Sequence, residues 1–218
     1  MRLCVGHAAL HGSFERYCEE LNLLEVPADV GRAPRRQRLQ QLREQAPEDF
    51  VFSVVLPTAV ASLDATPETE AELVRALGIV ELLRAEWLLL RTPSSVRPGE
   101  RTAAKLERLV ERLHGQRVAW EPAGLFDDRN TEHLAARLSL TLVRDLSRVD
   151  PAPGPVVYTR LRSLGRAGRL PESAAERVAD ALGEVDEVFV VVDAPGAKSI
   201  ARQLHEMLGS EPTVGGEH

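Results

Sequence analysis

Short apolar runs alternate with amphipathic runs along the whole chain. Continuous apolar runs such as Val188–Val192 are typical of parallel strands that are buried on both faces. The strands predicted in this way are Leu3–Gly6, Leu23–Val26, Phe50–Pro57, Trp87–Arg91, Arg117–Glu121, Leu140–Leu146, Pro155–Leu161 and Val188–Asp193.

Segments with helical spacing of apolar residues lie between the strands. One opens at Thr66-Pro67, where proline occupies the first helical position. The others are predicted at Phe14–Leu21, Pro34–Gln45, Glu100–Leu113, Asn130–Leu138, Pro171–Leu182 and Ala197–Leu208. The sixth connection, Ser147–Gly154, is short and proline-rich, and we expect it to be non-helical. Strands and helices in this alternation predict one TIM (β/α)8 barrel domain over residues 1–218. An open doubly wound sheet is the alternative.

Composition narrows the function classes. The chain of 218 residues is 44% hydrophobic and 28% charged, which is typical of a globular protein with a sizeable core. No apolar run approaches the roughly 18 residues of a membrane span, and the chain starts directly in a predicted strand. We therefore expect a cytoplasmic protein with no membrane partner. Arginine far outnumbers lysine, as in GC-rich bacterial genomes. The net charge of −6 disfavours a broad nucleic-acid-binding face.

Charged residues and one histidine gather where the predicted strands end. Functional groups of a (β/α)8 barrel lie at the carboxyl ends of its strands, because variable loops are carried there by a rigid sheet. The residues that this rule selects are His7, Glu25, Arg91, Glu121, Arg144, Asp145, Arg160, Arg162 and Asp193. Such a set either binds a polar ligand or satisfies its own charges.

Two glutamates are the candidates for catalysis. Glu25 and Glu121 could serve as general acid and base, because carboxylates in a partly dry site have their pKa values pushed apart. The alternative is that each is neutralised by an arginine, Arg91 or Arg160.

The sequence predicts no metal and no cofactor. His7 and His11 flank the first predicted loop, but a metal there would need a third ligand such as Glu25 or Asp193. Neither an HExxH motif nor a dense His/Asp/Glu series is present.

An anion site is expected between the seventh and eighth loops. Arg160 and Arg162 share one face of their strand, since side chains two apart point the same way. The segment Asp193–Ser199 adds Gly196, the free backbone N–H groups of a helix start and Lys198. Its Gly-Ala-Lys-Ser end is too short for a Walker A loop, which argues against ATP. The alternative is an ordinary helix cap with Lys198 in solvent. Further candidate ligand contacts are Arg91 and Asp145.

Three motifs carry a family resemblance. Residues 47–54 (Pro-Glu-Asp-Phe-Val-Phe-Ser-Val), 120–126 (Trp-Glu-Pro-Ala-Gly-Leu-Phe) and 158–161 (Tyr-Thr-Arg-Leu) resemble, in order and spacing, the third-, fifth- and seventh-strand motifs of the YecE-like barrels, domain-of-unknown-function family 72. The resemblance covers roughly residues 1 to 208 and implies a TIM barrel. It implies no particular activity.

The chain is a divergent example of that pattern. Val55 stands where the family has a lysine, Ala123 where it has an arginine, and Arg162 where it has a histidine. The first loop, Gly6–Gly12, also lacks the family's Gly-Thr-Ser-Gly-Trp-like sequence. An activity that needs those three side chains together is therefore not expected here.

Three functions follow as hypotheses. The first is a barrel that binds a small anionic ligand such as a sugar phosphate or nucleotide through Arg160 and Arg162, with any proton transfer by Glu25 and Glu121. The second is a non-catalytic binding or regulatory barrel. The third, binding of damaged nucleic acid, rests on fold analogy alone and is disfavoured by the acidic charge. The oligomeric state does not follow from the sequence.

Overall fold

The computed structural model describes residues 1–126, 128–163, 170–171 and 173–208. The chain folds into two compact units. The first unit comprises Met1–Glu25, Glu44–Val51 and Val143–His218, and the second comprises Val26–Arg43 and Phe52–Leu142. Among the described residues, no helix is both long and apolar enough to cross a membrane. A single domain over residues 1–218 stays a prediction.

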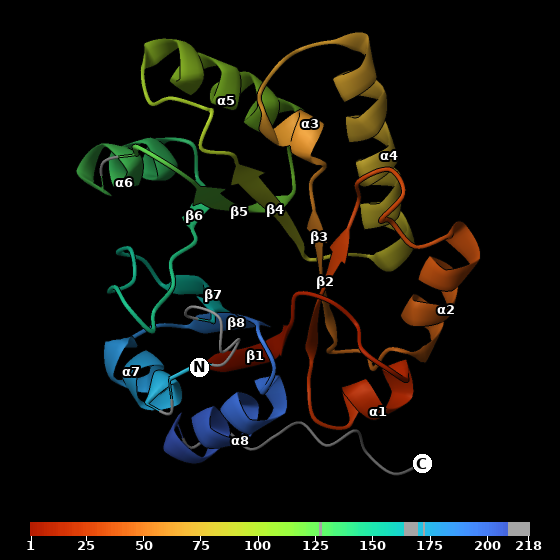
Figure 1. The fold of residues 1–218 in the computed structure, drawn as a ribbon, viewed down its shortest axis with the longest axis vertical. Helices are drawn as coiled ribbons and strands as arrows, with labels where there is room; N and C mark the ends of the chain where they lie inside the picture. The colour runs from red at the N-terminus through yellow and green to blue at the C-terminus, as the bar shows by residue number, and fades with distance from the viewer. Residues whose placement is uncertain (127, 164–169, 172, 209–218) are drawn as a thin grey trace. The chain divides into compact units, whose positions relative to one another are not determined.

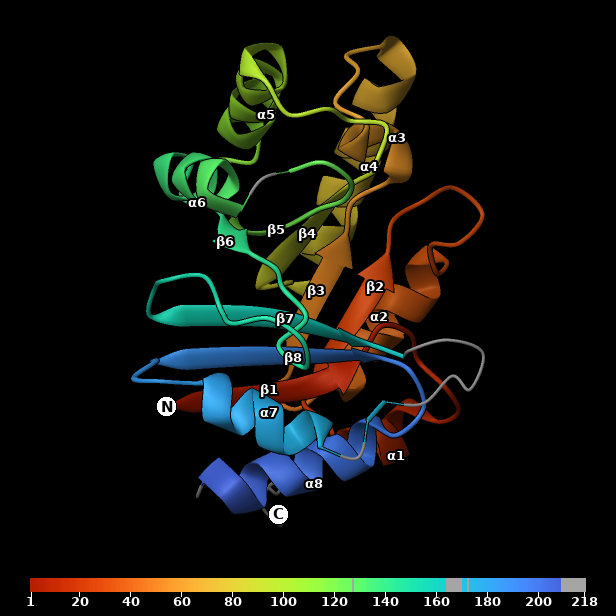
Figure 2. The same cartoon turned by 60° about the vertical axis from the view of Figure 1, so that its left-hand side comes forward.

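The first unit is built on parallel strands. β1 (Arg2–His7) pairs with β8 (Glu187–Asp193) along its whole length, and β8 pairs with β7 (Val156–Arg162). Figures 1 and 2 show these strands side by side, with α8 (Ala197–Leu208) beside α7 (Ala174–Ala181). The unit also holds α1 (Phe14–Cys18). Val188–Val192 are fully buried, as expected of a parallel strand covered on both faces.

A glycine allows the chain to pack tightly where β1 meets β2 (Leu23–Pro27). Gly6 is the register partner of Leu23. A Cβ built on Gly6 would lie 1.6 Å from the carbonyl oxygen of Leu23, which no side chain can tolerate. Close approach of two backbones is therefore the reason for glycine at this strand position.

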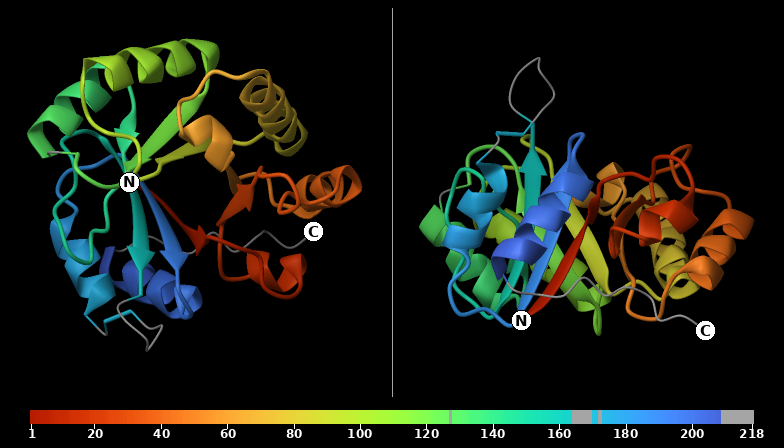
Figure 3. Two further views of the ribbon diagram at one scale, coloured as in Figure 1. Left: turned by 45° about the horizontal axis from the view of Figure 1, so that its top comes forward. Right: turned by 90° about the horizontal axis from the view of Figure 1, so that it is seen from below.

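The second unit holds most of β3 (Val51–Val55), followed by β4 (Trp87–Thr92), β5 (Arg117–Pro122) and β6 (Thr141–Leu142), each parallel to the next. Its helices lie along one side of these strands (Figure 3). They are α3 (Thr58–Ala61), α4 (Pro67–Leu83), α5 (Glu100–Arg112), α6 (Asp128–Arg137) and most of α2 (Arg36–Gln45).

The start predicted for α4 is confirmed by its cap. The Thr66 hydroxyl accepts from the backbone N–H of Thr69, and the Thr69 hydroxyl accepts from the backbone N–H of Thr66. This reciprocal pair satisfies two N–H groups that a helix start would otherwise leave without a partner. By contrast, α3 was not predicted from the sequence, because four residues are too few to show a helical period.

The sixth connection is non-helical, as the sequence predicts. The strand expected over Leu140–Leu146 is reduced to Thr141–Leu142, because the chain then turns onto β7. Arg144 forms a bridge with Thr159, and the backbone N–H of Leu146 donates to the Thr159 hydroxyl at 3.2 Å. The chain that follows the sixth strand thus pairs with the seventh.

Candidate functional site

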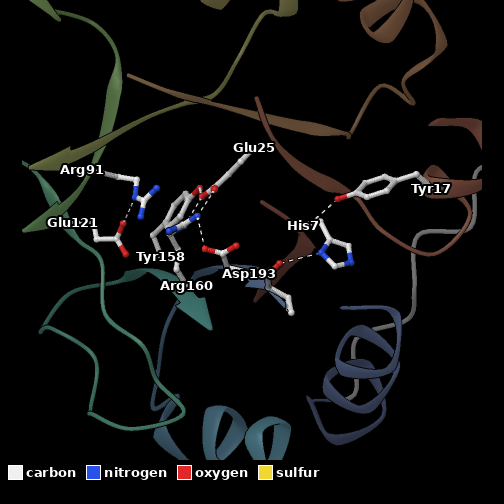
Figure 4. A network of polar contacts seen from close by, with 9 residues as sticks. His7, Tyr17, Glu25, Arg91, Glu121, Tyr158, Arg160 and Asp193 are labelled. Atoms are coloured by element: carbon white, nitrogen blue, oxygen red, sulfur yellow. Dashed lines mark hydrogen bonds and ion pairs between the residues drawn. The ribbon is translucent and has the colours of Figure 1, made fainter. Parts of the chain in front are cut away.

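A buried ion pair links β2 to β7 in the first unit (Figure 4). Nε and Nη2 of Arg160 donate to the two carboxylate oxygens of Glu25 at 3.0 and 2.9 Å, and the two side chains are 3% and 0% exposed. The Tyr158 hydroxyl donates to Glu25 at 3.0 Å from the same face of β7. Three donors therefore compensate a carboxylate that has lost its contact with water, which is the condition for burying it.

Asp193 extends this ion pair towards the surface. It ends β8, its side chain is 45% exposed, and its Oδ2 accepts from Nη2 of Arg160 at 3.4 Å. Its register partner on β7 is Arg162, which is half-buried and stands two residues beyond Arg160 on the same strand face. Glu25, Arg160, Arg162 and Asp193 are called the carboxyl-end cluster below. Its two carboxylates and two guanidinium groups balance in formal charge.

His7 ends the neighbouring strand β1. Its backbone N–H donates to the hydroxyl of Tyr17 at 2.7 Å, and this hydroxyl donates to the carbonyl of Leu23 at 2.5 Å. The ring Nδ1 lies 3.0 Å from the carbonyl oxygen of Val192, so Nδ1 carries the proton and Nε2 is the acceptor. Burial lowers the pKa of the His7 imidazole and raises the pKa of the Tyr17 hydroxyl. Both groups are therefore uncharged at neutral pH.

His11 does not complete a metal site with His7. The two rings meet edge to face, with their centroids 5.8 Å apart. In the part of the chain that the structure describes, no three His, Cys, Asp or Glu side chains are grouped as a metal ion would require. A metal-free protein stays a prediction.

Glu121 is paired with Arg91 in the second unit. The two are register partners on β5 and β4, and Nε of Arg91 lies 2.6 Å from Oε2 of Glu121. The glutamate side chain is 11% exposed and the arginine side chain 44%. The expected pairing of Glu121 with a basic side chain is confirmed. Both candidate catalytic glutamates are thus neutralised by an arginine, and their acid–base roles stay predictions.

Two other predicted residues have partners outside the carboxyl-end cluster or in its backbone. Asp145 accepts from the backbone N–H of Ser147 and of Arg162, at 3.1 and 3.2 Å, and so holds the turn after β6. Lys198 forms an ion pair with Glu20 rather than joining the carboxyl-end cluster. The Lys198 side chain is half-exposed, which agrees with the alternative of a lysine in solvent, and its role as an anion ligand stays a prediction.

Gly196 precedes α8 with a φ of +107°, which suits glycine, and its carbonyl accepts the first helical hydrogen bond from Ile200. Residues 164–169, which belong to the expected seventh loop of the anion site, lie outside the described residues. The structure therefore brings together Glu25, Arg160, Arg162 and Asp193 from the predicted set.

Sequence reasoning missed the two tyrosines of this site. Tyr158 stands two residues before Arg160, so the strand period could have placed it on the same face. Tyr17 gave no comparable signal, because its hydroxyl is hydrogen-bonded to backbone atoms of β1 and β2, which no side-chain pattern reveals.

Comparison with known proteins shows both the fold and the family. Residues 7–215 match the model of the family described as "Protein of unknown function DUF72". Two solved members are similar over nearly the whole chain. The Enterococcus faecalis V583 protein is 14% identical, with a TM-score of 0.75 and coverage of 99% of each chain. The Thermotoga maritima MSB8 protein is 18% identical, with a TM-score of 0.74 and coverage of 96% of this chain and 100% of that one.

A xylose isomerase domain-containing protein from Salmonella typhimurium LT2 is 14% identical, with a TM-score of 0.61 and coverage of 95% of this chain and 96% of that one. A search of curated proteins gave no match. The structural likenesses confirm the TIM (β/α)8 fold and exclude the open doubly wound sheet. On the match over residues 7–215, the chain is a member of the DUF72 family of proteins of unknown function.

Proposed function

We propose that this barrel binds a small ligand that carries both an anionic group and a hydroxyl group, such as a sugar phosphate or a hydroxy acid. The ligand's site is the outer part of the carboxyl-end cluster, where β7 and β8 end. Arg162 binds the anionic group, and Asp193 accepts a hydrogen bond from the hydroxyl.

The observation that carries this proposal is the half-exposed carboxylate of Asp193. This carboxylate accepts a hydrogen bond from the buried guanidinium of Arg160. Its register partner on β7 is Arg162. A neutral side chain would serve as well at this position if Asp193 only filled space, because its partner Arg160 is already compensated by Glu25. An acceptor and a donor side by side at a strand end suit a ligand with both kinds of group.

This proposal changes the role expected of Arg160. Its side chain is 3% exposed and hydrogen-bonded to two carboxylates, so it is not available as the primary anion ligand. Arg160 instead positions Asp193, and the Glu25–Tyr158 contact positions Arg160. Replacement of the family's histidine by Arg162 favours anion binding, because a guanidinium stays charged at every physiological pH.

We propose that the barrel binds its ligand without catalysing a reaction. Both candidate glutamates are engaged in ion pairs, and breaking either pair would be needed before it transferred a proton. Binding of nucleic acid is not proposed, since the chain is acidic and the cluster is electrically balanced.

Calorimetric titration with glucose 6-phosphate and with inorganic phosphate tests the proposal. We expect Arg162→Ala to lower the affinity for both ligands by about tenfold or more, which corresponds to the loss of one charge-assisted hydrogen bond. Asp193→Asn should weaken the sugar phosphate but not phosphate, which has no sugar hydroxyl. Arg202→Ala is the matched control, because Arg202 is an exposed arginine of the same unit that contacts Glu20. No binding to wild type at about 10 mM ligand, or equal binding by Arg162→Ala, would refute the proposal.

A further inference from the structure

The second unit contains a pocket of about 250 Å3 that has no part in the carboxyl-end cluster. It is open to solvent and is lined by α3 and the loop that follows, the first turns of α4, and one face of α5. Figures 1 and 2 show α3 and this loop in orange, next to α4. On α5, Lys105, Arg108, Leu109 and Arg112 line the pocket. Their spacing of three or four residues places them on the same side of the helix.

The inner wall of the pocket is apolar. Val60, Leu63 and Leu73 are buried, and Leu109 is half-buried. The transfer of a ligand's apolar part from water to such a hydrocarbon wall has a favourable free energy.

Leu63 occupies a backbone conformation that its residue type disfavours. It follows α3 with a φ of +61°, a left-handed position at which glycine is the usual choice. A leucine there carries conformational strain, because its Cβ crowds the neighbouring backbone. Its buried side chain forms part of the pocket wall.

The rim of the pocket carries an excess of positive charge. Lys105 is paired with Asp64 at 2.9 Å, and Arg112 is paired with Glu70. Arg108 donates through Nε to the carbonyl of Ala104 on its own helix, at 3.2 Å. Over the described residues, no carboxylate lies within ion-pair distance of Arg108, which leaves one uncompensated cation at the rim.

We infer that this pocket binds a small amphipathic carboxylate. The hydrocarbon part contacts the leucine wall, and the carboxylate receives hydrogen bonds from the guanidinium of Arg108. A cavity of roughly 150 Å3 lined by similar side chains holds a benzene molecule. The present volume therefore fits a ligand of roughly ten non-hydrogen atoms, such as an aryl acetate or a medium-chain fatty acid. This site is independent of the function proposed above.

An NMR titration of 15N-labelled protein with phenylacetate tests the inference. We expect saturable shift changes of backbone amides in α3, α4 and α5. The neutral isostere phenylacetamide should bind at least about tenfold more weakly, because it cannot use the charge of Arg108. Equal binding of the acid and the amide, or no shifts at about 10 mM phenylacetate, would overturn the inference.

Variants separate the pocket from the rest of the molecule. Arg108→Gln should lower the affinity for phenylacetate by about tenfold. Arg101→Gln, on the same helix but outside the pocket lining, should leave the affinity unchanged. Leu109→Trp fills the cavity and should abolish binding. Arg162→Ala should leave phenylacetate binding unchanged. Unaltered binding by Arg108→Gln contradicts the inference even if Leu109→Trp does not fold.

Discussion

Replacing Glu25 with glutamine removes the negative charge that compensates the buried guanidinium of Arg160. The glutamine retains the size of the side chain and one acceptor oxygen, but its NH2 group cannot accept, so the negative charge and one hydrogen bond from Arg160 are lost together. With both side chains buried, Glu25→Gln leaves Arg160 its 3.4 Å contact with the half-exposed carboxylate of Asp193.

Breaking a buried ion pair by removing one partner lowers the free energy of unfolding by about 3–5 kcal/mol. The remaining contact with Asp193 and the retained acceptor place Glu25→Gln at the lower end, about 3 kcal/mol. For a chain of this length, such a loss lowers the melting temperature by about 6–12 °C. Glu121→Gln is the matched comparison. Its partner Arg91 is 44% exposed, so we expect a loss of about 1 kcal/mol.

Urea unfolding at pH 7, followed by circular dichroism, measures both losses on the same scale, provided that the transitions are two-state. The double variant Glu25→Leu/Arg160→Met removes both charges and should recover most of the stability lost in Glu25→Gln. A loss for Glu25→Gln no greater than for Glu121→Gln would show that the ion pair is not a buried determinant of stability.

Two further predictions concern glycine and histidine. Gly6→Ala should destabilise the protein by at least about 3 kcal/mol in urea unfolding, because its Cβ would overlap the Leu23 carbonyl. Gly78→Ala, in open space within α4, should instead stabilise it by about 0.5–1 kcal/mol, and equal effects would refute the packing argument. Because burial lowers the pKa of His7, the unfolded chain takes up this proton first as the pH falls below about 6.5, and folded stability falls with it. His7→Asn should therefore lose less stability than wild type between pH 7 and pH 5 in urea unfolding, whereas His114→Asn should follow wild type.

Fold class was predictable because the strand candidates are short, largely apolar runs, which a parallel sheet buried on both faces accommodates. The sixth strand shows where this reasoning fails. Its apolar pattern runs from Leu140 to Leu146, but Asp145 turns the chain through its own hydrogen bonds to Ser147 and Arg162. Side chain to backbone bonds of this kind end a strand without any change in hydrophobic pattern.

The site was predictable as a set of positions rather than as a set of contacts. The strand-end rule selected Glu25, Arg160 and Asp193 together, and the strand period put Arg160 and Arg162 on one face. Which arginine would compensate which glutamate depends on strand register, and the sequence leaves register open. The same limit applies to Lys198, whose partner Glu20 follows a helix nearly 180 residues earlier in the chain.

A crystal grown without phosphate or sulfate and soaked with glucose 6-phosphate tests the proposed binding function most directly. We predict difference density at the ends of β7 and β8, with the phosphate against the guanidinium of Arg162 and a sugar hydroxyl within hydrogen-bond distance of Asp193. Sugar phosphate bound away from both residues, or no density at concentrations well above the calorimetric Kd, would contradict the assignment of the carboxyl-end cluster as the ligand site.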